Sequence, residues 1–209
     1  MHKPKKDVHI KKNKILMMNI AIFASGEGTN AERICNFFAV SKTVRIVGIV
    51  CNRAQAGVYD RAKRLGVEIV HISREKLLEG GQALDLLHKW KTDLIVLAGY
   101  MCPITAPYLE AFPNKILNIH PALLPKYGGK GMYGEHVHRA VIAAGETVSG
   151  ISVHLVDDHY DHGRTLCQAS CPVLSGDTVE SLAARIHRLE HRYYPICIEQ
   201  YIEELQQMQ

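Results

Sequence analysis

The sequence predicts an α/β protein with a doubly wound, Rossmann-like and mostly parallel sheet that carries helices on both faces. Two observations lead to this fold class. Apolar runs typical of buried parallel strands alternate with helical patterns along the 209-residue chain. A glycine-containing loop also follows the first apolar run and leads directly into a helix. We expect the later strands to be antiparallel.

Composition points to one soluble catalytic domain over residues 18–209, preceded by a disordered basic tail over residues 1–17. The chain is 47% hydrophobic and 22% charged, which is ordinary for a globular protein. No apolar run approaches the roughly 20 residues that cross a membrane, and no secretory signal is evident, so we expect a cytoplasmic location. The net charge of +4 depends on six lysines in the tail, which argues against a nucleic-acid surface.

The cysteines predict reduced thiols. Six are present, far apart and without a Cys-x-x-Cys pair. This pattern suits buried thiols in a cytoplasmic enzyme better than a disulfide framework or a zinc site. They are Cys35, Cys51, Cys102, Cys167, Cys171 and Cys197.

The first predicted strand, 19–24, is followed by a glycine loop at 25–30 that could bind an anion. A strand, glycine loop and helix in this order point backbone N–H groups and the helix dipole at a ligand. Gly28 permits close approach, and Thr29 and Asn30 add side-chain donors or a cap. A tight turn without a ligand is the alternative. A nicotinamide site is a weak competitor, because Ala31 replaces the last glycine of the dinucleotide motif and the next strand lacks an acidic end.

The middle of the chain continues the alternation. We expect strands at 44–50, 67–72 and 93–98, and a helix at 56–65 closed by Gly66. A helical pattern runs from Ser73 to Trp90, where Gly80 and Gly81 interrupt or split it.

The strand expected at 115–119 ends in a polar pair. Alternation places Asn118 and His120 on the same side, and Pro121 then stops the strand at its carboxyl end. A carboxamide and an imidazole aimed at one point could polarise a carbonyl group and hold the oxyanion formed on attack. On this motif alone, an Asn in a turn and a His bonded to backbone explain the residues equally well.

The last third is expected to contain a flexible glycine-rich loop at 126–134, a helix at 135–144, strands at 150–156 and 165–173, and a long helix from Asp177. Pro195 is expected to kink or end that helix. His136 and His138 have a spacing that resembles metal ligands, but positions i and i+2 point apart on a helix. We therefore predict no metal.

Residues 118–127, Asn-Ile-His-Pro-Ala-Leu-Leu-Pro-Lys-Tyr, closely resemble the signature of the folate-dependent formyltransferases. Within that superfamily the chain resembles the phosphoribosylglycinamide formyltransferases, from about Met18 to about Tyr201. The resemblance implies transfer of a formyl group from 10-formyltetrahydrofolate to the amine of 5′-phosphoribosylglycinamide in purine biosynthesis. Formylglycinamide ribonucleotide and tetrahydrofolate would be the products.

The resemblance also implies catalytic roles for Asn118, His120 and Asp161. Register from Val156 in the pattern Val-x-x-x-x-Asp-x-Gly selects Asp161, and not Asp157 or Asp158. A carboxylate beside His120 would favour the imidazolium form, so we expect Asp161 to keep that histidine cationic.

The binding roles follow from the same resemblance. Gly28, Thr29 and Asn30 would hold the ribose phosphate, and Glu190 would contact the glycinamide. Cys102 stands where the family commonly has arginine, and Pro103 supplies no N–H, so the folate pose is expected to differ in detail. The folate-binding residues would be Arg74, Met101, Cys102, Pro103, Ile104, Asn118, Val156 and Asp161.

Three other functions remain open at this stage. Methionyl-tRNA formyltransferase carries a further carboxy-terminal domain, and formyltetrahydrofolate deformylase an amino-terminal one, whereas this chain shows neither pattern. A non-catalytic phosphosugar-binding module would not need Asn118, His120 and Asp161 together. The expected partners are small molecules, without nucleic acid or membrane, and the chain is expected to be a monomer or a homodimer.

Overall fold

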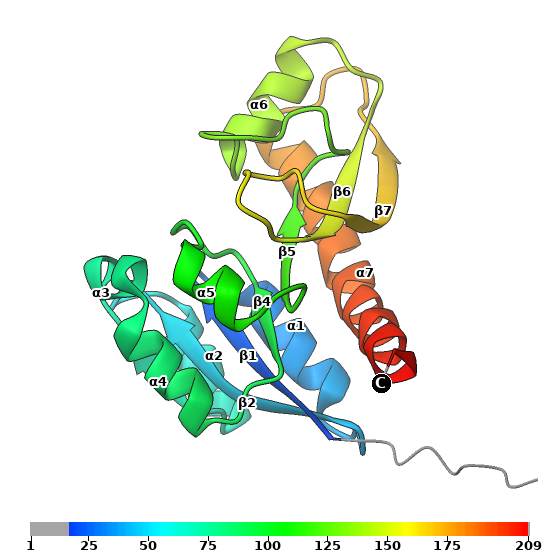
Figure 1. Cartoon of the computed structure of the whole chain (residues 1–209). Helices are drawn as coiled ribbons and strands as arrows, with labels where there is room; N and C mark the ends of the chain where they lie inside the picture. Colours follow the sequence, from blue (N-terminus) through cyan, green and yellow to red (C-terminus); the bar gives the residue numbers. More distant parts are fainter. Residues whose placement is uncertain (1–16, 209) are drawn as a thin grey trace, which may run out of the picture.

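A seven-stranded sheet in the order β3-β2-β1-β4-β5-β6-β7 forms the centre of the computed structural model, which describes residues 17–208 (Figure 1). β1 to β5 run parallel, and β6 and β7 are antiparallel to their neighbours. The strands are β1 (Met18–Ala24), β2 (Val44–Cys51), β3 (Ile69–His71), β4 (Leu94–Leu97), β5 (Ile116–His120), β6 (Val148–Leu155) and β7 (Thr165–Pro172). The predicted tail at 1–17 lies outside the described residues except for Met17.

Helices cover both faces of the sheet, as predicted. Alternation along β1 shows the two sides: Ile20 and Ile22 enter one apolar cluster, and Ala21 and Phe23 enter the other. The first cluster takes side chains from α1, α2, α6 and α7, and the second from α3, α4 and α5. The helices are α1 (Thr29–Phe38), α2 (Val58–Leu65), α3 (Arg74–Glu79), α4 (Gly81–Lys89), α5 (Ala106–Ala111), α6 (Glu135–Ala143) and α7 (Val179–Gln207).

Two helices differ from expectation. The short helix α5 was not predicted, although Pro107 in its first turn is a helix-start signal. α7 continues through Pro195 to Gln207, so of the two expected outcomes, a kink or an end, the end is wrong. The Tyr194 hydroxyl donates to the carbonyl oxygens of Leu97 and Leu117, at 3.0 and 3.3 Å, which anchors this buried turn despite the missing proline N–H.

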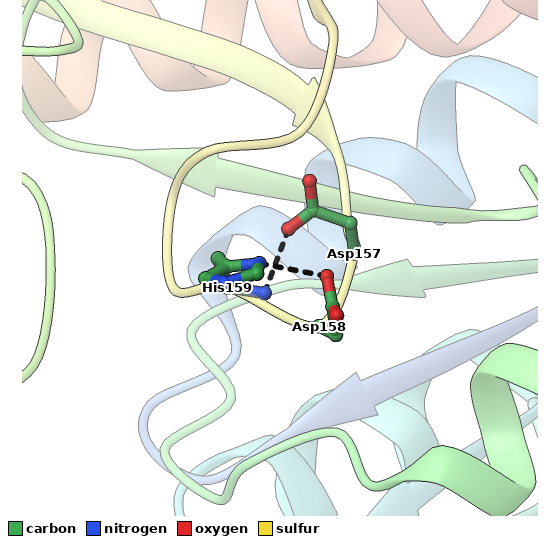
Figure 2. A group of neighbouring side chains, drawn as sticks. All are labelled: Asp157, Asp158 and His159. Carbon is green, nitrogen blue, oxygen red and sulfur yellow. Dashed lines mark hydrogen bonds and ion pairs between the residues drawn. The ribbon is translucent and has the colours of Figure 1, made fainter.

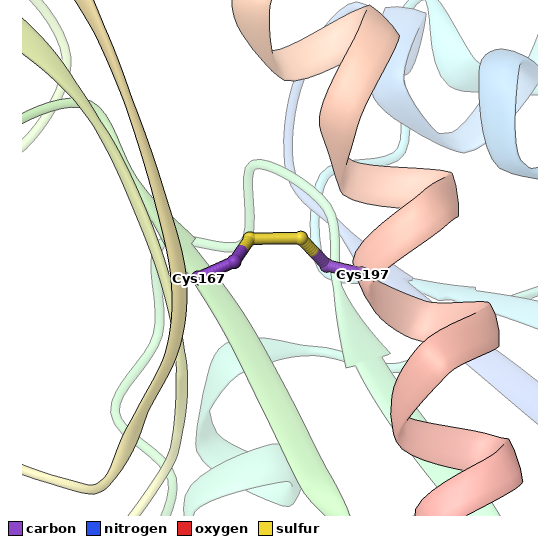
Figure 3. The surroundings of a disulfide bond; sticks show 2 residues. All are labelled: Cys167 and Cys197. Atoms are coloured by element: carbon purple, nitrogen blue, oxygen red, sulfur yellow. A yellow bond between two sulfur atoms is a disulfide. The ribbon is translucent and has the colours of Figure 1, made fainter.

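The expectation of six reduced thiols is wrong. Cys167 on β7 and Cys197 on α7 form a disulfide (Figure 3), while the other four cysteines are free and buried. The two residues are 30 positions apart, and β7 packs on α7. Sequence spacing carries no sign of that packing, and the cysteine argument for a cytoplasmic location is weakened.

The sheet also places the candidate site. β2 and β4 lie on opposite sides of β1, so the order in which the strands are added to the sheet reverses at β1. In sheets of this kind, ligands bind at such a reversal, beyond the carboxyl ends of the strands. β5, which carries the central motif, is the next strand along (Figure 1). Among the described residues, no helix has the length and apolar character needed to cross a membrane.

Candidate active site

Asn118 and His120 lie at the end of β5 and face two residues of β6. The antiparallel register pairs Asn118 with His154 and His120 with Ser152. Asn118 Nδ2 is 3.1 Å from His154 Nε2, and His154 Nδ1 is 2.8 Å from the Leu155 carbonyl oxygen. That carbonyl accepts the Nδ1 proton, so Nε2 is left to accept from the Asn118 amide. His154 therefore fixes the orientation of Asn118.

Asp161 joins the two histidines. Its Oδ2 is 3.5 Å from His120 Nδ1, and its Oδ1 is 3.5 Å from His154 Nε2. The main-chain N–H of Gly129 donates to the same carboxylate at 2.9 Å. Asp161 has a φ of 60°, a left-handed conformation that Asp and Asn adopt more readily than other side chains. The structure thus places the aspartate selected by register beside His120.

Two glycines permit this arrangement. A Cβ on Gly163 would lie 1.9 Å from the Leu155 carbonyl oxygen, so the returning loop can approach β6 only without a side chain. A Cβ on Gly128 would lie 2.6 Å from Leu124 Cδ2 and 3.2 Å from the Cβ of Asp161. Close backbone approach therefore requires glycine at 163, whereas a side chain at 128 would have to displace the Leu124 side chain.

Burial sets the protonation of His120. The side chain is 3% exposed, and burial lowers its pKa below the usual histidine value. The Asp161 carboxylate and the Tyr127 carbonyl oppose this effect but only in part. The expectation that Asp161 keeps His120 cationic is therefore corrected, because desolvation of the charged ring outweighs the attraction. A neutral imidazole can instead accept a proton during the reaction.

Asp161 itself remains ionised. Burial alone would raise the pKa of this carboxyl group. The nearby His154 and His120 rings and the Gly129 N–H together outweigh burial, so the pKa of Asp161 lies below its usual range. The site thus pairs a carboxylate with a neutral imidazole that gains stabilisation when it takes a proton.

The glycine-rich segment at 126–134 contacts the same site. The Tyr127 carbonyl oxygen is 2.8 Å from His120 Nε2, and Gly129 donates to Asp161. Lys126 and the Tyr127 hydroxyl each bond Glu146 Oε1, at 2.8 and 2.9 Å. The segment therefore covers the imidazole and is held to Glu146 in the turn after α6.

Glu190 lies beside the start of α1, although 160 residues separate it from Asn30. Asn30 Nδ2 donates to Glu190 Oε2 at 2.9 Å, and His187 Nδ1 is 3.1 Å from the same oxygen. Asn30 and Glu190 are 8% and 6% exposed. Glu190 raises the pKa of His187. The residues expected to bind the two ends of the glycinamide substrate are therefore in direct contact.

The glycine loop presents main-chain groups to this region. Gly28, with a φ of 73°, is the N-cap of α1, and no side chain caps the helix. Thr29 and Asn30 thus lie inside the helix, and Asn30 already donates to Glu190. An anion here would be held mainly by the free N–H groups of the first turn.

The segment with the expected folate-binding residues Met101 to Ile104 contacts the loop that follows β1. The Met101 N–H donates to Ser25 Oγ at 2.9 Å, which ties the two loops together. Ile104 and Val156 pack against one apolar cluster, and Met101 is exposed. Ile104 and Val156 thus belong to the face of the sheet that α3, α4 and α5 cover.

Cys102 lies in the same segment and is 7% exposed. Its sulfur accepts from Asn52 Nδ2 at 3.2 Å. Burial raises the pKa of the Cys102 thiol, and the positive charges of Arg74 and Arg53 offset this only in part. Pro103 is half-buried. A protonated, buried thiol makes a poor nucleophile.

Asp157 and Asp158 lie away from the catalytic contacts, as the register predicted. Both aspartates contact His159 (Figure 2). The His159 Nδ1 is 2.8 Å from Asp158 Oδ1, and the His159 main-chain N–H donates to Asp157 Oδ1 at 2.9 Å. All three side chains are exposed, with one ligand atom of each within 4.8 Å of the others. Exposed acidic groups of this kind are ordinary on a solvated turn.

Sequence reasoning missed several groups at the site. His154, Tyr127, Gly129 and His187 were given no role, yet each contacts a predicted site residue. The alternation that put Ser152 and His154 on one face of their strand was a usable signal for His154. The other contacts depend on loop conformation and helix packing.

The comparisons with known proteins agree with this geometry. The Formyl transferase family matches residues 18–198. A chloroplastic phosphoribosylglycinamide formyltransferase of Vigna unguiculata is 38% identical over 97% of this chain, which spans only 65% of that relative's length. The Escherichia coli K12 phosphoribosylglycinamide formyltransferase is 35% identical over 87% of this chain and 85% of its own.

A solved structure supports the fold as well. The glycinamide ribonucleotide transformylase 1 of Symbiobacterium toebii aligns with a TM-score of 0.82 and 36% identity, covering 95% of this chain and 92% of that one. The family match over residues 18–198 includes the sheet, the glycine loop and the segments that carry Asn118, His120 and Asp161. The chain belongs to the formyl transferase family.

Proposed function

We propose that this protein transfers a formyl group from 10-formyltetrahydrofolate to the primary amine of 5′-phosphoribosylglycinamide. The observation that carries the proposal is the contact of Asp161 with His120, across from Asn118 and beside the paired Asn30 and Glu190. Relatives named phosphoribosylglycinamide formyltransferase over most of the chain support this choice of substrate.

The proposed chemistry begins with attack of the amine nitrogen on the formyl carbon, which leaves negative charge on the formyl oxygen. One Asn118 N–H is committed to His154, and the other can donate to that oxygen. Once the Tyr127 carbonyl has withdrawn from Nε2, neutral His120 carries its proton on Nδ1 toward Asp161 and accepts the proton of the attacking nitrogen at Nε2. Asp161 stabilises the imidazolium that results. The imidazolium then gives the proton to the leaving nitrogen of the folate.

The binding roles are assigned by the same proposal. The first turn of α1 holds the phosphate through main-chain N–H groups, and Glu190 accepts from the glycinamide amine. Met101, Ile104 and Val156 line the folate side, with Arg74 near its charged end. Cytoplasmic location, the oligomeric state and the absence of a metal stay predictions.

The test is an assay with three acceptors. Purified protein and 10-formyltetrahydrofolate are incubated with 5′-phosphoribosylglycinamide, with methionyl-tRNA, or without an acceptor. We expect formylated glycinamide ribonucleotide in the first mixture, no formylated tRNA in the second and little free formate in the third. Rapid formate release without an acceptor would indicate a deformylase instead. His120→Ala is the matched inactive control.

A further inference from the structure

Figure 3 shows the Cys167–Cys197 disulfide. The bond borders a cavity of about 220 Å3 that opens to solvent at the outer edge of the sheet. Arg164, Gln200 and Glu204 line the same cavity, and Arg164 Nη2 donates to Glu204 Oε1 at 2.8 Å. Cys197 is 4% exposed, whereas Cys167 is half-buried. Of the two cysteines that line this cavity, Cys167 is therefore the more exposed residue.

We propose that this disulfide is a thiol-exchange site, opened by a small thiol that enters the cavity. The reagent thiolate bonds to the Cys167 sulfur, the bond to Cys197 breaks, and Cys197 leaves with the electron pair and takes a proton from water. A second reagent thiol attacks the mixed disulfide and releases Cys167. The protein gains two electrons and two thiols, and the two reagent thiols become one disulfide.

Opening the bond would free β7 more than α7. The helix keeps other anchors, because Tyr194 donates to the Leu97 and Leu117 carbonyls and the Tyr201 hydroxyl donates to the Asn114 carbonyl at 2.5 Å. β7 is the outermost strand and pairs only with β6. The disulfide is thus a covalent tie between an edge strand and a helix that is otherwise well held.

A chain of hydrogen bonds connects β7 to the catalytic turn. Gln168, next to Cys167, donates through Nε2 to Ser152 Oγ at 2.8 Å and to the Leu124 carbonyl at 3.0 Å. Ser152 Oγ donates to the Ala122 carbonyl at 2.7 Å and accepts from the Leu124 N–H at 2.9 Å. These bonds hold the turn that follows His120. A shift of β7 would move this turn, so we infer that the redox state of the pair alters kcat.

The first experiment counts thiols in the folded full-length protein. Native protein is alkylated with and without prior dithiothreitol or reduced glutathione, and the modified cysteines are mapped by mass spectrometry. We expect Cys167 and Cys197 to react only after thiol treatment, and oxidised glutathione to restore the bond. Reaction of both without reductant, or reduction only in denaturant, would overturn the proposal. This readout does not depend on formyl transfer.

Access through the cavity is tested separately. Gln200→Trp fills the cavity, so reduction by dithiothreitol should slow several-fold, while Glu199→Trp on the adjacent exposed position should not slow it. Equal rates in the two variants would show that the reagent does not enter by the cavity.

The link to catalysis is tested with kcat. Reduction should lower kcat several-fold and leave both KM values nearly unchanged. Cys167→Ser and Cys197→Ser should show the reduced value whatever the thiol concentration, and Cys171→Ser, on the same strand but outside the bond, should respond like the parent protein. An unchanged kcat on reduction would overturn the coupling to the catalytic turn.

Discussion

The main-chain carbonyl oxygen of Tyr127 lies 2.8 Å from Nε2 of His120, and the other ring nitrogen faces Asp161 at 3.5 Å. Both nitrogens of the histidine are therefore engaged by the protein. For His120 to exchange a proton with substrate, the segment at 126–134 must withdraw from Nε2. This segment is held to Glu146 by Lys126 and by the Tyr127 hydroxyl.

Loosening that anchor should help substrate entry. In Glu146→Gln the ion pair with Lys126 is lost, so the segment should withdraw more readily. Because exposed ion pairs are weak, kcat/KM should rise by no more than about fivefold. The measurement is steady-state kinetics with both substrates, and Glu110→Gln on an exposed turn of α5 is the control. An unchanged or lower kcat/KM would mean that release of this segment does not limit access.

Asn30 should matter for one substrate and not the other. Asn30→Ala removes the donor to Glu190 and one polar group beside the phosphate loop. A lost hydrogen bond to a charged group costs roughly 1.5–3 kcal/mol, so the KM for the glycinamide should rise about tenfold or more. The KM for folate should barely change. Asn36→Ala, on the exposed face of the same helix, is the control, and equal effects on both substrates would refute the assignment.

His154 should act through Asn118. His154→Phe keeps a ring in the core but removes the acceptor that orients the Asn118 amide. Loss of a neutral hydrogen bond of about 1 kcal/mol predicts a fall in kcat of roughly fivefold with little change in either KM. His154→Gln should recover part of the loss. A rise in either KM without a fall in kcat would indicate a binding role instead. The control is His88→Phe on the exposed end of α4, which should change neither kcat nor KM.

Cys102 should be dispensable for the chemistry. Burial raises the pKa of its thiol, so little thiolate is present at neutral pH, and formyl transfer needs none. Cys102→Ser should retain most of kcat in the steady-state assay. A loss of about a hundredfold would instead indicate a covalent role.

The fold and the centre of the site were accessible from local patterns. Alternation through residues 115–119 and the stop at Pro121 place Asn118 and His120 together at a strand end, and the structure agrees. Asp161 was placed by its resemblance to a family loop. Its left-handed backbone, which turns the carboxylate toward His120, is not visible in local spacing.

Other features depend on packing between distant segments. The disulfide requires Cys167 on β7 to meet Cys197 on α7, and the expected free thiols followed from spacing alone. The pKa of His120 was expected to rise because only the charge of Asp161 was considered. Burial cannot be read from a sequence motif, and it lowers the pKa of His120 by more than the Asp161 carboxylate raises it.

The account depends most on the pairing of Asp161 with His120, and kinetics of Asp161→Asn test it most directly. Asn tolerates the left-handed backbone, so the fold and both KM values should change little. kcat should fall by roughly 10²–10³-fold, comparable to the loss of an oxyanion-hole donor.

The pH profile of the same variant shows in which direction Asp161 shifts the pKa of His120. The acid limb of kcat/KM for the parent protein should lie below the usual histidine pKa of about 6.5, because burial lowers the pKa of His120. Asp161 opposes that effect, so its neutralisation should move the limb to still lower pH. Asp157→Asn and Asp158→Asn should leave kcat and the limb unchanged. If either of these crippled kcat while Asp161→Asn stayed active, the central claim would be contradicted.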